Sequence, residues 1–324
     1  MPLIRTAEPT CDAGLWQPAP GTPDSGYPPG WSRCAELATN ESKDRTHSAG
    51  KEHAQKCPDR VLGGAQGLNM KTEKQKVALV TGASRGIGRA IAVRLSKDGL
   101  FVVVHYAHDR KAAAETLRQI EESGGRGFLA RADFATLKGV RDLFAATDAH
   151  LEKRLGTRNF DVLVNNAGIS PGATFAEATE AAFDELVAVN LKAPFFIAQQ
   201  AMSRLREGGR IVNISSGTSQ MAMPEEPVYA MTKAALNSFT RSLAKELAPR
   251  GITVNAIGPG IVDTEFQAEW LSDPAARDFA ASIAALGRLG QPEDIADVAA
   301  FLSSPDARWI TGAYIDASGG SLLG

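Results

Sequence analysis

Tyr229 and Lys233 lie about one helical turn apart in a helical pattern that covers residues 228–247, so their side chains share one face. A phenol, with a pKa of about 10, is a poor acid–base group at neutral pH, and a neighbouring ammonium group lowers that pKa. The pair therefore has the chemistry of a general acid–base site. Taken alone, this spacing more often marks a solvated helix face.

The surroundings of this pair strengthen the functional interpretation. Ser216 follows the strand-like run 210–215 and precedes the Tyr229 helix. In a parallel sheet, ligands bind at the carboxyl ends of the strands. We therefore expect Ser216 at the same edge as a bound ligand.

A glycine-rich turn follows the apolar run 77–80. Its spacing is Gly82-x3-Gly86-x-Gly88, and a helical pattern begins directly after it. Glycine lets backbone turn tightly and lets a ligand come close, and the start of a helix attracts anions. The combination predicts a cradle for a dinucleotide pyrophosphate, although a glycine cluster alone also fits a purely structural turn.

Three further stretches follow strands or interrupt helices. Residues 165–168, Asn-Asn-Ala-Gly, end the strand-like run 161–165, and Pro259-Gly260 with Thr264 follows the run 253–257. Each of these is also an ordinary loop sequence. Asn190 falls inside an apolar helical pattern, where a buried amide must be hydrogen-bonded.

Strand-like runs alternate with amphipathic helical patterns from residue 76 onward. This alternation predicts a doubly wound, seven-stranded parallel sheet of the Rossmann-like α/β class. Residues 263–289 leave the alternation, and we expect a substrate lid there. The expected strands are 77–80, 101–105, 127–131, 161–165, 210–215, 253–257 and 313–316; the expected helices are 87–97, 111–122, 137–155, 181–206, 228–247 and 292–302.

Composition limits the class of partner. The chain has 324 residues, 44% of them hydrophobic, and a formal net charge of −2, so we expect neither nucleic acid nor a membrane as partner. Its cysteines, Cys11, Cys34 and Cys57, show no metal or disulfide spacing, which favours a cytoplasmic location.

The first 74 residues differ from the remainder, because they are rich in proline and charge and show no periodicity. We interpret 1–74 as a disordered leader or the product of a mis-assigned start, with Met70 a natural alternative start. Residues 75–324 then form one domain.

Together these motifs resemble the short-chain dehydrogenase/reductase family, in its compact single-domain branch. The resemblance covers residues 76–320 and includes the glycine turn, residues 165–168, Asn190, Ser216, the Tyr229–Lys233 pair and Pro259-Gly260. It implies hydride transfer between a nicotinamide and a carbonyl or secondary alcohol.

The resemblance also implies the catalytic roles. Tyr229 would give its proton to the substrate oxygen, and Ser216 would hydrogen-bond that oxygen. Lys233 would lower the Tyr229 pKa and hold the nicotinamide ribose. Asn190 would hold a water that links Lys233 to solvent.

The same resemblance favours NADP(H) over NAD(H). The second strand ends without the acidic residue of NAD-preferring members, while Arg85, Arg110 and Lys111 lie close by in the sequence. Asp133 would contact adenine. The implied cofactor contacts are Gly82, Ser84, Arg85, Gly86, Ile87, Gly88, Tyr106, Asp133, Asn165, Ala167, Gly168, Tyr229, Lys233, Pro259, Gly260, Val262 and Thr264.

For the substrate, the resemblance points first to 3-oxoacyl-[acyl-carrier-protein] reductases. Basic residues beside the cleft would then dock an acidic carrier protein, and the candidates are Arg204, Arg206, Arg241 and Arg250. The acidic pair Glu225-Glu226 opposes such docking. The alternatives are a reductase or dehydrogenase of small ketones or sugars in secondary metabolism, and a non-catalytic NADP(H)-sensing regulator.

Two further expectations concern assembly and metals. Family members commonly pair through the helices that correspond to 181–206 and 228–247, which implies a homotetramer or homodimer. The histidines, His105 included, show no metal-binding motif, so we expect solvated side chains and no metal site.

Overall fold

The computed structural model describes residues 75–323. The leader expected at residues 1–74 lies outside this range, as do the cysteines.

A single parallel sheet organises the described residues. Its seven strands follow the order β3-β2-β1-β4-β5-β6-β7, and every neighbouring pair is parallel. This confirms the predicted doubly wound α/β fold. The strands are β1 Val77–Val80, β2 Phe101–Tyr106, β3 Arg126–Arg131, β4 Phe160–Asn165, β5 Leu205–Ile214, β6 Thr253–Pro259 and β7 Tyr314–Ala317.

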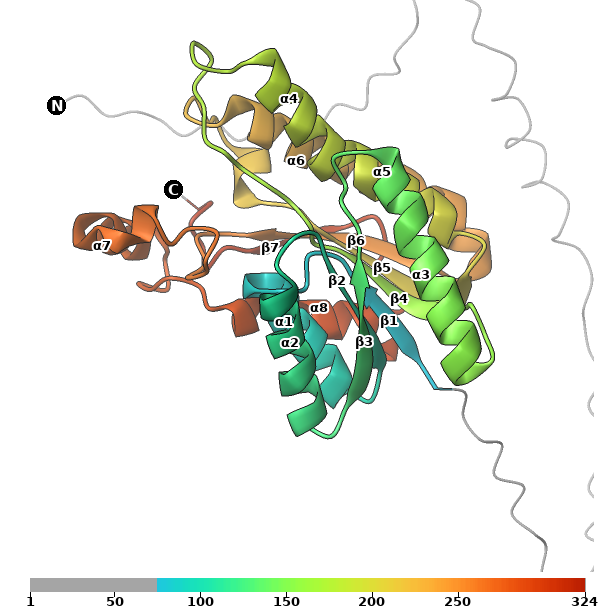
Figure 1. Cartoon of the computed structure of the whole chain (residues 1–324). Helices are drawn as coiled ribbons and strands as arrows, with labels where there is room; N and C mark the ends of the chain where they lie inside the picture. Colours follow the sequence, from blue (N-terminus) through green and yellow to red (C-terminus); the bar gives the residue numbers. More distant parts are fainter. Residues whose placement is uncertain (1–74, 324) are drawn as a thin grey trace, which may run out of the picture. The chain divides into compact units, whose positions relative to one another are not determined.

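Helices cover both faces of this sheet (Figure 1). Helices α1, α2 and α8 contribute to the core on one face, and α3, α5 and α6 contribute to the core on the other. Within residues 75–323, no helix is long and apolar enough to cross a bilayer. The helices are α1 Gly86–Lys97, α2 Arg110–Glu122, α3 Leu137–Leu155, α4 Glu180–Val187, α5 Ala193–Ala201, α6 Pro227–Leu247, α7 Pro274–Ile283 and α8 Pro292–Ser303.

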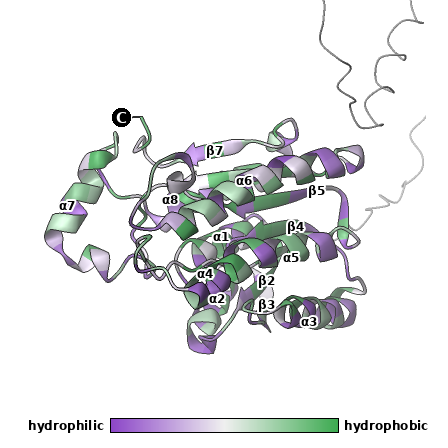
Figure 2. Ribbon diagram, turned by 90° about the horizontal axis from the view of Figure 1, so that it is seen from above, coloured by the Kyte–Doolittle hydropathy of each residue, from purple (hydrophilic) through white to green (hydrophobic). Residues whose placement is uncertain are grey.

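The two hydrophobic cores follow from the two-residue period of a strand. On β1, Val77 and Leu79 pack on the α3 side, and Ala78 and Val80 pack on the α1 side; all four are fully buried. Strands buried on both faces need continuous apolar runs, which is why strand β4 is mainly hydrophobic in colour in Figure 2.

The helix expected over residues 181–206 is shorter and interrupted. A π-helical turn, Ala188–Lys192, separates α4 from α5, and α5 ends at Ala201. Strand β5 already begins at Leu205, which pairs with Phe160 of β4 before a register irregularity. This strand pairing overrides the helical pattern of the last residues of the range.

The segment 263–289 contains a helix, α7, that the sequence analysis did not predict. Asp273 caps its first turn by accepting a 2.9 Å hydrogen bond from the backbone N–H of Ala275, and Pro274 occupies the first helical position. Both are standard helix-start signals. Helix α7 lies away from the layers around the sheet (Figure 1).

Candidate active site

The glycine turn lies at the carboxyl edge of the sheet, between β1 and α1. Gly82 and Gly86 have positive φ angles of 63° and 53°, which favour glycine. Gly88 is needed for packing, because a Cβ atom there would lie 2.2 Å from the Gly82 carbonyl oxygen and 2.4 Å from Asn166 Nδ2. A side chain at position 88 would therefore disrupt the contact between the glycine turn and the start of α1.

Thr81 and Asn166 tie this turn to the turn that follows β4. The Asn166 amide donates 3.0 Å hydrogen bonds to the carbonyl oxygens of Thr81 and Gly82. Thr81 Oγ1 accepts hydrogen bonds from the backbone N–H groups of Asn166 and Ala167 at 2.9 and 3.1 Å. Neither Thr81 nor Asn166 was among the predicted site residues, although Asn166 lies within residues 165–168 and Thr81 directly precedes Gly82.

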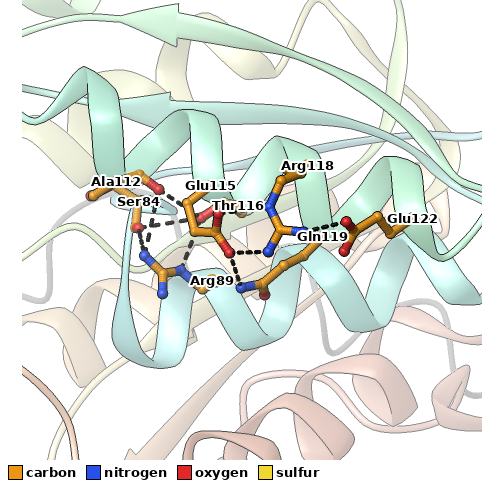
Figure 3. Close-up of polar contacts among 8 residues, drawn as sticks. All are labelled: Ser84, Arg89, Ala112, Glu115, Thr116, Arg118, Gln119 and Glu122. Atoms are coloured by element: carbon orange, nitrogen blue, oxygen red, sulfur yellow. Dashed lines mark hydrogen bonds and ion pairs between the residues drawn. The ribbon is translucent and has the colours of Figure 1, made fainter.

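Arg89 anchors the other side of the turn. Its guanidinium donates hydrogen bonds to the Ser84 carbonyl oxygen at 2.6 Å and to Thr116 Oγ1 at 3.1 Å, so α1 holds the turn against α2 (Figure 3). Arg118 forms ion pairs with Glu115 and Glu122 along the exposed face of α2. Arg89 is thus a structural residue of the turn.

His105 is not the solvated residue expected from the sequence. Its side chain is only 1% exposed, because β2 is buried on both faces. Nδ1 accepts a 2.9 Å hydrogen bond from the backbone N–H of Gly82. The strong β-branched run around it was the signal that a buried position was involved.

Ser216, Tyr229 and Lys233 come together at the carboxyl edge as predicted. Ser216 caps a short 3₁₀ turn after β5, and Tyr229 lies in the first turn of α6. Lys233 Nζ lies 5.5 Å from the centroid of the Tyr229 ring and donates a 2.9 Å hydrogen bond to the Ile214 carbonyl oxygen. The structure therefore places a phenol, a hydroxyl and an ammonium group beside one another.

The pKa of Tyr229 differs from the sequence-based expectation. Burial raises it to about 12, a hydrogen bond with Ser216 opposes this rise, and the Glu226 carboxylate adds to it. Burial also lowers the pKa of Lys233 to about 8. The net shift of the Tyr229 pKa is therefore upward, because burial outweighs the opposing hydrogen bond. The lowering of this pKa by Lys233 stays a prediction.

Asn190 and Lys233 flank Gly168. A Cβ atom at Gly168 would lie 3.4 Å from Asn190 Oδ1 and 3.5 Å from Lys233 Nζ. The buried Asn190 amide is satisfied by the backbone of Ile169, from which Oδ1 accepts at 2.9 Å and to which Nδ2 donates at 2.8 Å. Asn190 thus fixes the chain that follows residues 165–168, and its π-helical turn is of a kind frequent at functional sites.

The side chain of Asn165 is engaged inside the sheet. Its Nδ2 donates a 2.9 Å hydrogen bond to Asn213 of β5, and Asn213 donates a 2.8 Å hydrogen bond to Thr240 of α6. These buried groups connect β4 to the helix that carries Tyr229. The side chain of Asn165 therefore stabilises the packing of β4, β5 and α6 and supports the site indirectly.

The segment after β6 closes over the glycine turn. Thr264 Cβ lies 3.3 Å from the position that a Cβ atom of Gly86 would occupy. Val262 forms a bridge with Gly290, and an ion pair between Asp263 and Arg277 fastens α7 to the same segment. Pro259 ends β6, and a Cβ atom at Gly260 would lie 2.7 Å from the Ser318 carbonyl oxygen.

Phe266 brings the expected lid segment beside the acid–base pair. Its ring centroid lies 6.4 Å from that of Tyr229. Phe266 is 48% exposed, so its ring provides apolar surface next to the tyrosine.

The end of β2 offers no free carboxylate for a ribose. Tyr106 ends the strand, and the next acidic residue, Asp109, caps α2 by accepting a 2.8 Å hydrogen bond from Ala112 N–H. Arg85 is exposed at the start of α1, as are Arg110 and Lys111 at the start of α2. Asp133, after β3, lies 3.9 Å from His108.

Three of the four basic residues expected beside the cleft lie elsewhere. Arg204 and Arg206 flank the start of β5, at the opposite edge of the sheet from Ser216, and pair with Asp148 and Asp161. Arg250 pairs with Glu207 near the same edge. These three arginines therefore lie at the end of the sheet opposite to Ser216 and do not border the candidate active site.

Comparisons with known proteins agree with this geometry. A family model described as "Enoyl-(Acyl carrier protein) reductase" matches residues 82–321. LugOII, a promiscuous reductase that catalyses keto-reduction at C1 during lugdunomycin biosynthesis, has a solved structure that is 48% identical with a TM-score of 0.74, covering 77% of this chain and 98% of that chain.

Two further relatives are ketoreductases or reductases by name. The angucycline C-6 ketoreductase LanV with bound NADP is 46% identical with a TM-score of 0.74, covering 77% of this chain and 96% of that chain. Versicolorin reductase 1 of Aspergillus parasiticus is 37% identical over 257 residues, which are 76% of this chain and 96% of that protein. The chain therefore belongs to the short-chain dehydrogenase/reductase family. It is an NAD(P)-dependent oxidoreductase.

Gly88→Ala tests the packing of the glycine turn. The added Cβ would clash with the Gly82 carbonyl group, and we expect a loss of about 3 kcal/mol in the free energy of unfolding, measured by urea denaturation. Gly99→Ala is the matched control, because Gly99 has a φ of 87° but open space around its Cβ position; it should cost only about 1 kcal/mol. Equal losses in the two variants would contradict the packing argument.

Proposed function

We propose that the protein is an NADPH-dependent ketoreductase that acts on a ring ketone of a polycyclic aromatic compound. The main observation that supports carbonyl reduction is that Lys233 Nζ lies 5.5 Å from the centroid of the Tyr229 ring, at the carboxyl edge of the sheet. The names of LugOII, LanV and versicolorin reductase 1 support the substrate class.

The catalytic roles follow from the chemistry of the residues. Bound NADPH would supply the hydride. Tyr229, protonated at neutral pH, would give its proton to the carbonyl oxygen, and Ser216 would hydrogen-bond that oxygen as negative charge develops. Lys233 would stabilise the phenolate left on Tyr229 and hold the nicotinamide ribose, while Asn190 would hold a water that returns a proton.

The groups around the glycine turn fit NADP(H). Gly82, Gly86 and Gly88 leave backbone accessible at the start of α1, where a pyrophosphate is favoured. The exposed guanidinium of Arg85 is the candidate for a 2′-phosphate. LanV, which is 46% identical, holds NADP; we propose that this chain also prefers NADP(H) over NAD(H).

The surface near Tyr229 favours a flat apolar substrate. Phe266 supplies exposed apolar area beside it, and a LanV structure holds rabelomycin with NADP. Acyl-carrier-protein docking has less support, because Glu225 and Glu226 are the charged residues just before Tyr229. A 3-oxoacyl thioester remains the second candidate, favoured by the description of the matching family model.

We also propose a cytoplasmic homotetramer or homodimer. Exposed apolar side chains support this assembly: Phe183 on α4, Phe195 on α5 and Met231 on α6 are 40%, 47% and 56% exposed. The presence of Ser216, Tyr229 and Lys233 in one place argues against the alternative, a non-catalytic NADP(H) sensor.

The first test is a rate assay with Tyr229→Phe as control. We expect NADPH oxidation with polycyclic aromatic ketones such as rabelomycin, and little with an acetoacetyl thioester. Tyr229→Phe removes the proton donor and should lower kcat at least about 100-fold while leaving the NADPH dissociation constant unchanged. Turnover of the thioester alone would favour the second candidate, and substantial activity of Tyr229→Phe would remove the assigned acid.

The pH dependence of reduction should follow Lys233. Its charged form stabilises the phenolate that forms on Tyr229, and its pKa is about 8. We therefore expect kcat/KM for the ketone to be flat below about pH 8 and to fall above it. Tyr229, with a pKa of about 12, stays protonated throughout. A rate that rises between pH 8 and pH 10 would contradict this assignment.

Arg85→Ala tests the preference for NADP(H). Loss of a charge-assisted hydrogen bond to the 2′-phosphate should raise the KM for NADPH about tenfold and change the KM for NADH less than twofold. Lys97→Ala is the control, because Lys97 is an exposed basic residue at the opposite end of α1. Equal effects of Arg85→Ala on both cofactors would exclude Arg85 as the phosphate contact.

A further inference from the structure

His105 has a buried polar side chain that plays no part in the proposed mechanism. It lies on β2, between β1 and β3 in the sheet (Figure 1), and is 1% exposed. A buried imidazole must have partners for its ring nitrogens or it destabilises the fold. Its two nitrogens have different partners on two different turns.

The partners define the tautomer of the ring. The backbone N–H of Gly82 donates a 2.9 Å hydrogen bond to Nδ1, so Nδ1 carries no proton. Nε2 lies 3.0 Å from the Ala132 carbonyl oxygen and therefore carries the proton that it donates. Burial lowers the pKa of His105 to about 4, although the Ala132 hydrogen bond and Asp133 oppose the shift, so the ring is neutral at physiological pH.

The two partners belong to the two walls of the proposed cofactor site. Gly82 is the first glycine of the pyrophosphate turn and has a positive φ of 63°. Ala132 directly precedes Asp133, the residue expected at the adenine. One imidazole therefore connects the turn after β1 with the turn after β3, while the backbone of His105 also accepts a 2.8 Å hydrogen bond from Ala83 N–H.

We propose that His105 is a positioning residue for NADP(H): it fixes the first peptide of the pyrophosphate turn and the segment that carries Asp133 at the spacing the dinucleotide requires. The inference rests on the proposed function for the identity of the ligand. It assigns no chemical step to His105, because its nitrogens are occupied inside the sheet.

The alternative is that His105 only fills the core. Its ring stacks on Phe134, with the centroids 4.3 Å apart and the planes inclined by 11°. Packing and hydrogen bonding can be separated by substitution. His105→Phe keeps an aromatic ring against Phe134 and removes both hydrogen bonds, whereas His105→Asn keeps one donor and one acceptor. Phe134→Leu removes the stacking and leaves both hydrogen bonds.

The test measures NADPH dissociation constants by fluorescence titration, kcat and KM for a ketone substrate, and thermal unfolding. We expect His105→Phe to raise the NADPH dissociation constant about tenfold, with kcat at saturating NADPH and the ketone KM changed less than about threefold. His105→Asn should recover most of the affinity. Phe134→Leu should lower the unfolding temperature but leave NADPH affinity within about twofold of the original.

The outcomes separate this inference from the proposed function. NADPH affinity within twofold of the original in His105→Phe, or an equal loss of affinity in Phe134→Leu, would overturn the positioning role. Failure of the unsubstituted protein to bind NADPH would instead overturn the proposed function. If His105→Phe does not fold, ¹⁵N NMR of the unsubstituted protein decides: a proton on Nδ1, or imidazole resonances unchanged by saturating NADPH, would refute the proposal.

Discussion

The hydrogen bonds from the Asn166 amide to the carbonyl oxygens of Thr81 and Gly82 are the contacts on which the site depends. They join the turn after β1 to the turn after β4. In the strand order, β2 and β3 lie on one side of β1, and β4 to β7 lie on the other. These hydrogen bonds therefore lie at the switch point between β1 and β4, where open α/β sheets bind ligands. They connect the glycine turn, which belongs to the proposed cofactor site, with the strands and helices that carry the proposed catalytic residues.

The sequence predicted those parts of the fold that local pattern determines. Strands buried on both faces need continuous apolar runs, so β1 was predicted with its observed ends. Helix α3 was also predicted with its observed ends. Ser216, Tyr229 and Lys233 could be predicted to meet, because a parallel sheet brings the carboxyl ends of its strands to one edge. The chemical types of these residues then restricted the reaction class.

The parts that the sequence did not predict depend on long-range contacts. Helix α5 ends early because Leu205 pairs with Phe160, and no local signal reveals that pairing. Arg204 and Arg206 looked available to a partner, but they pair with carboxylates at the far edge of the sheet. The apolar run around His105 indicated burial, but its partners Gly82 and Ala132 could not be predicted because they are distant in sequence.

Burial determines the protonation states of the acid–base pair. It favours the neutral form of both groups, so that Tyr229 has a pKa of about 12 and Lys233 a pKa of about 8. Glu226 adds to the cost of a phenolate. Near neutral pH, the phenol therefore keeps its proton while the ammonium remains largely charged. In the proposed mechanism, Tyr229 is thus in the protonated form from which a carbonyl oxygen would take its proton.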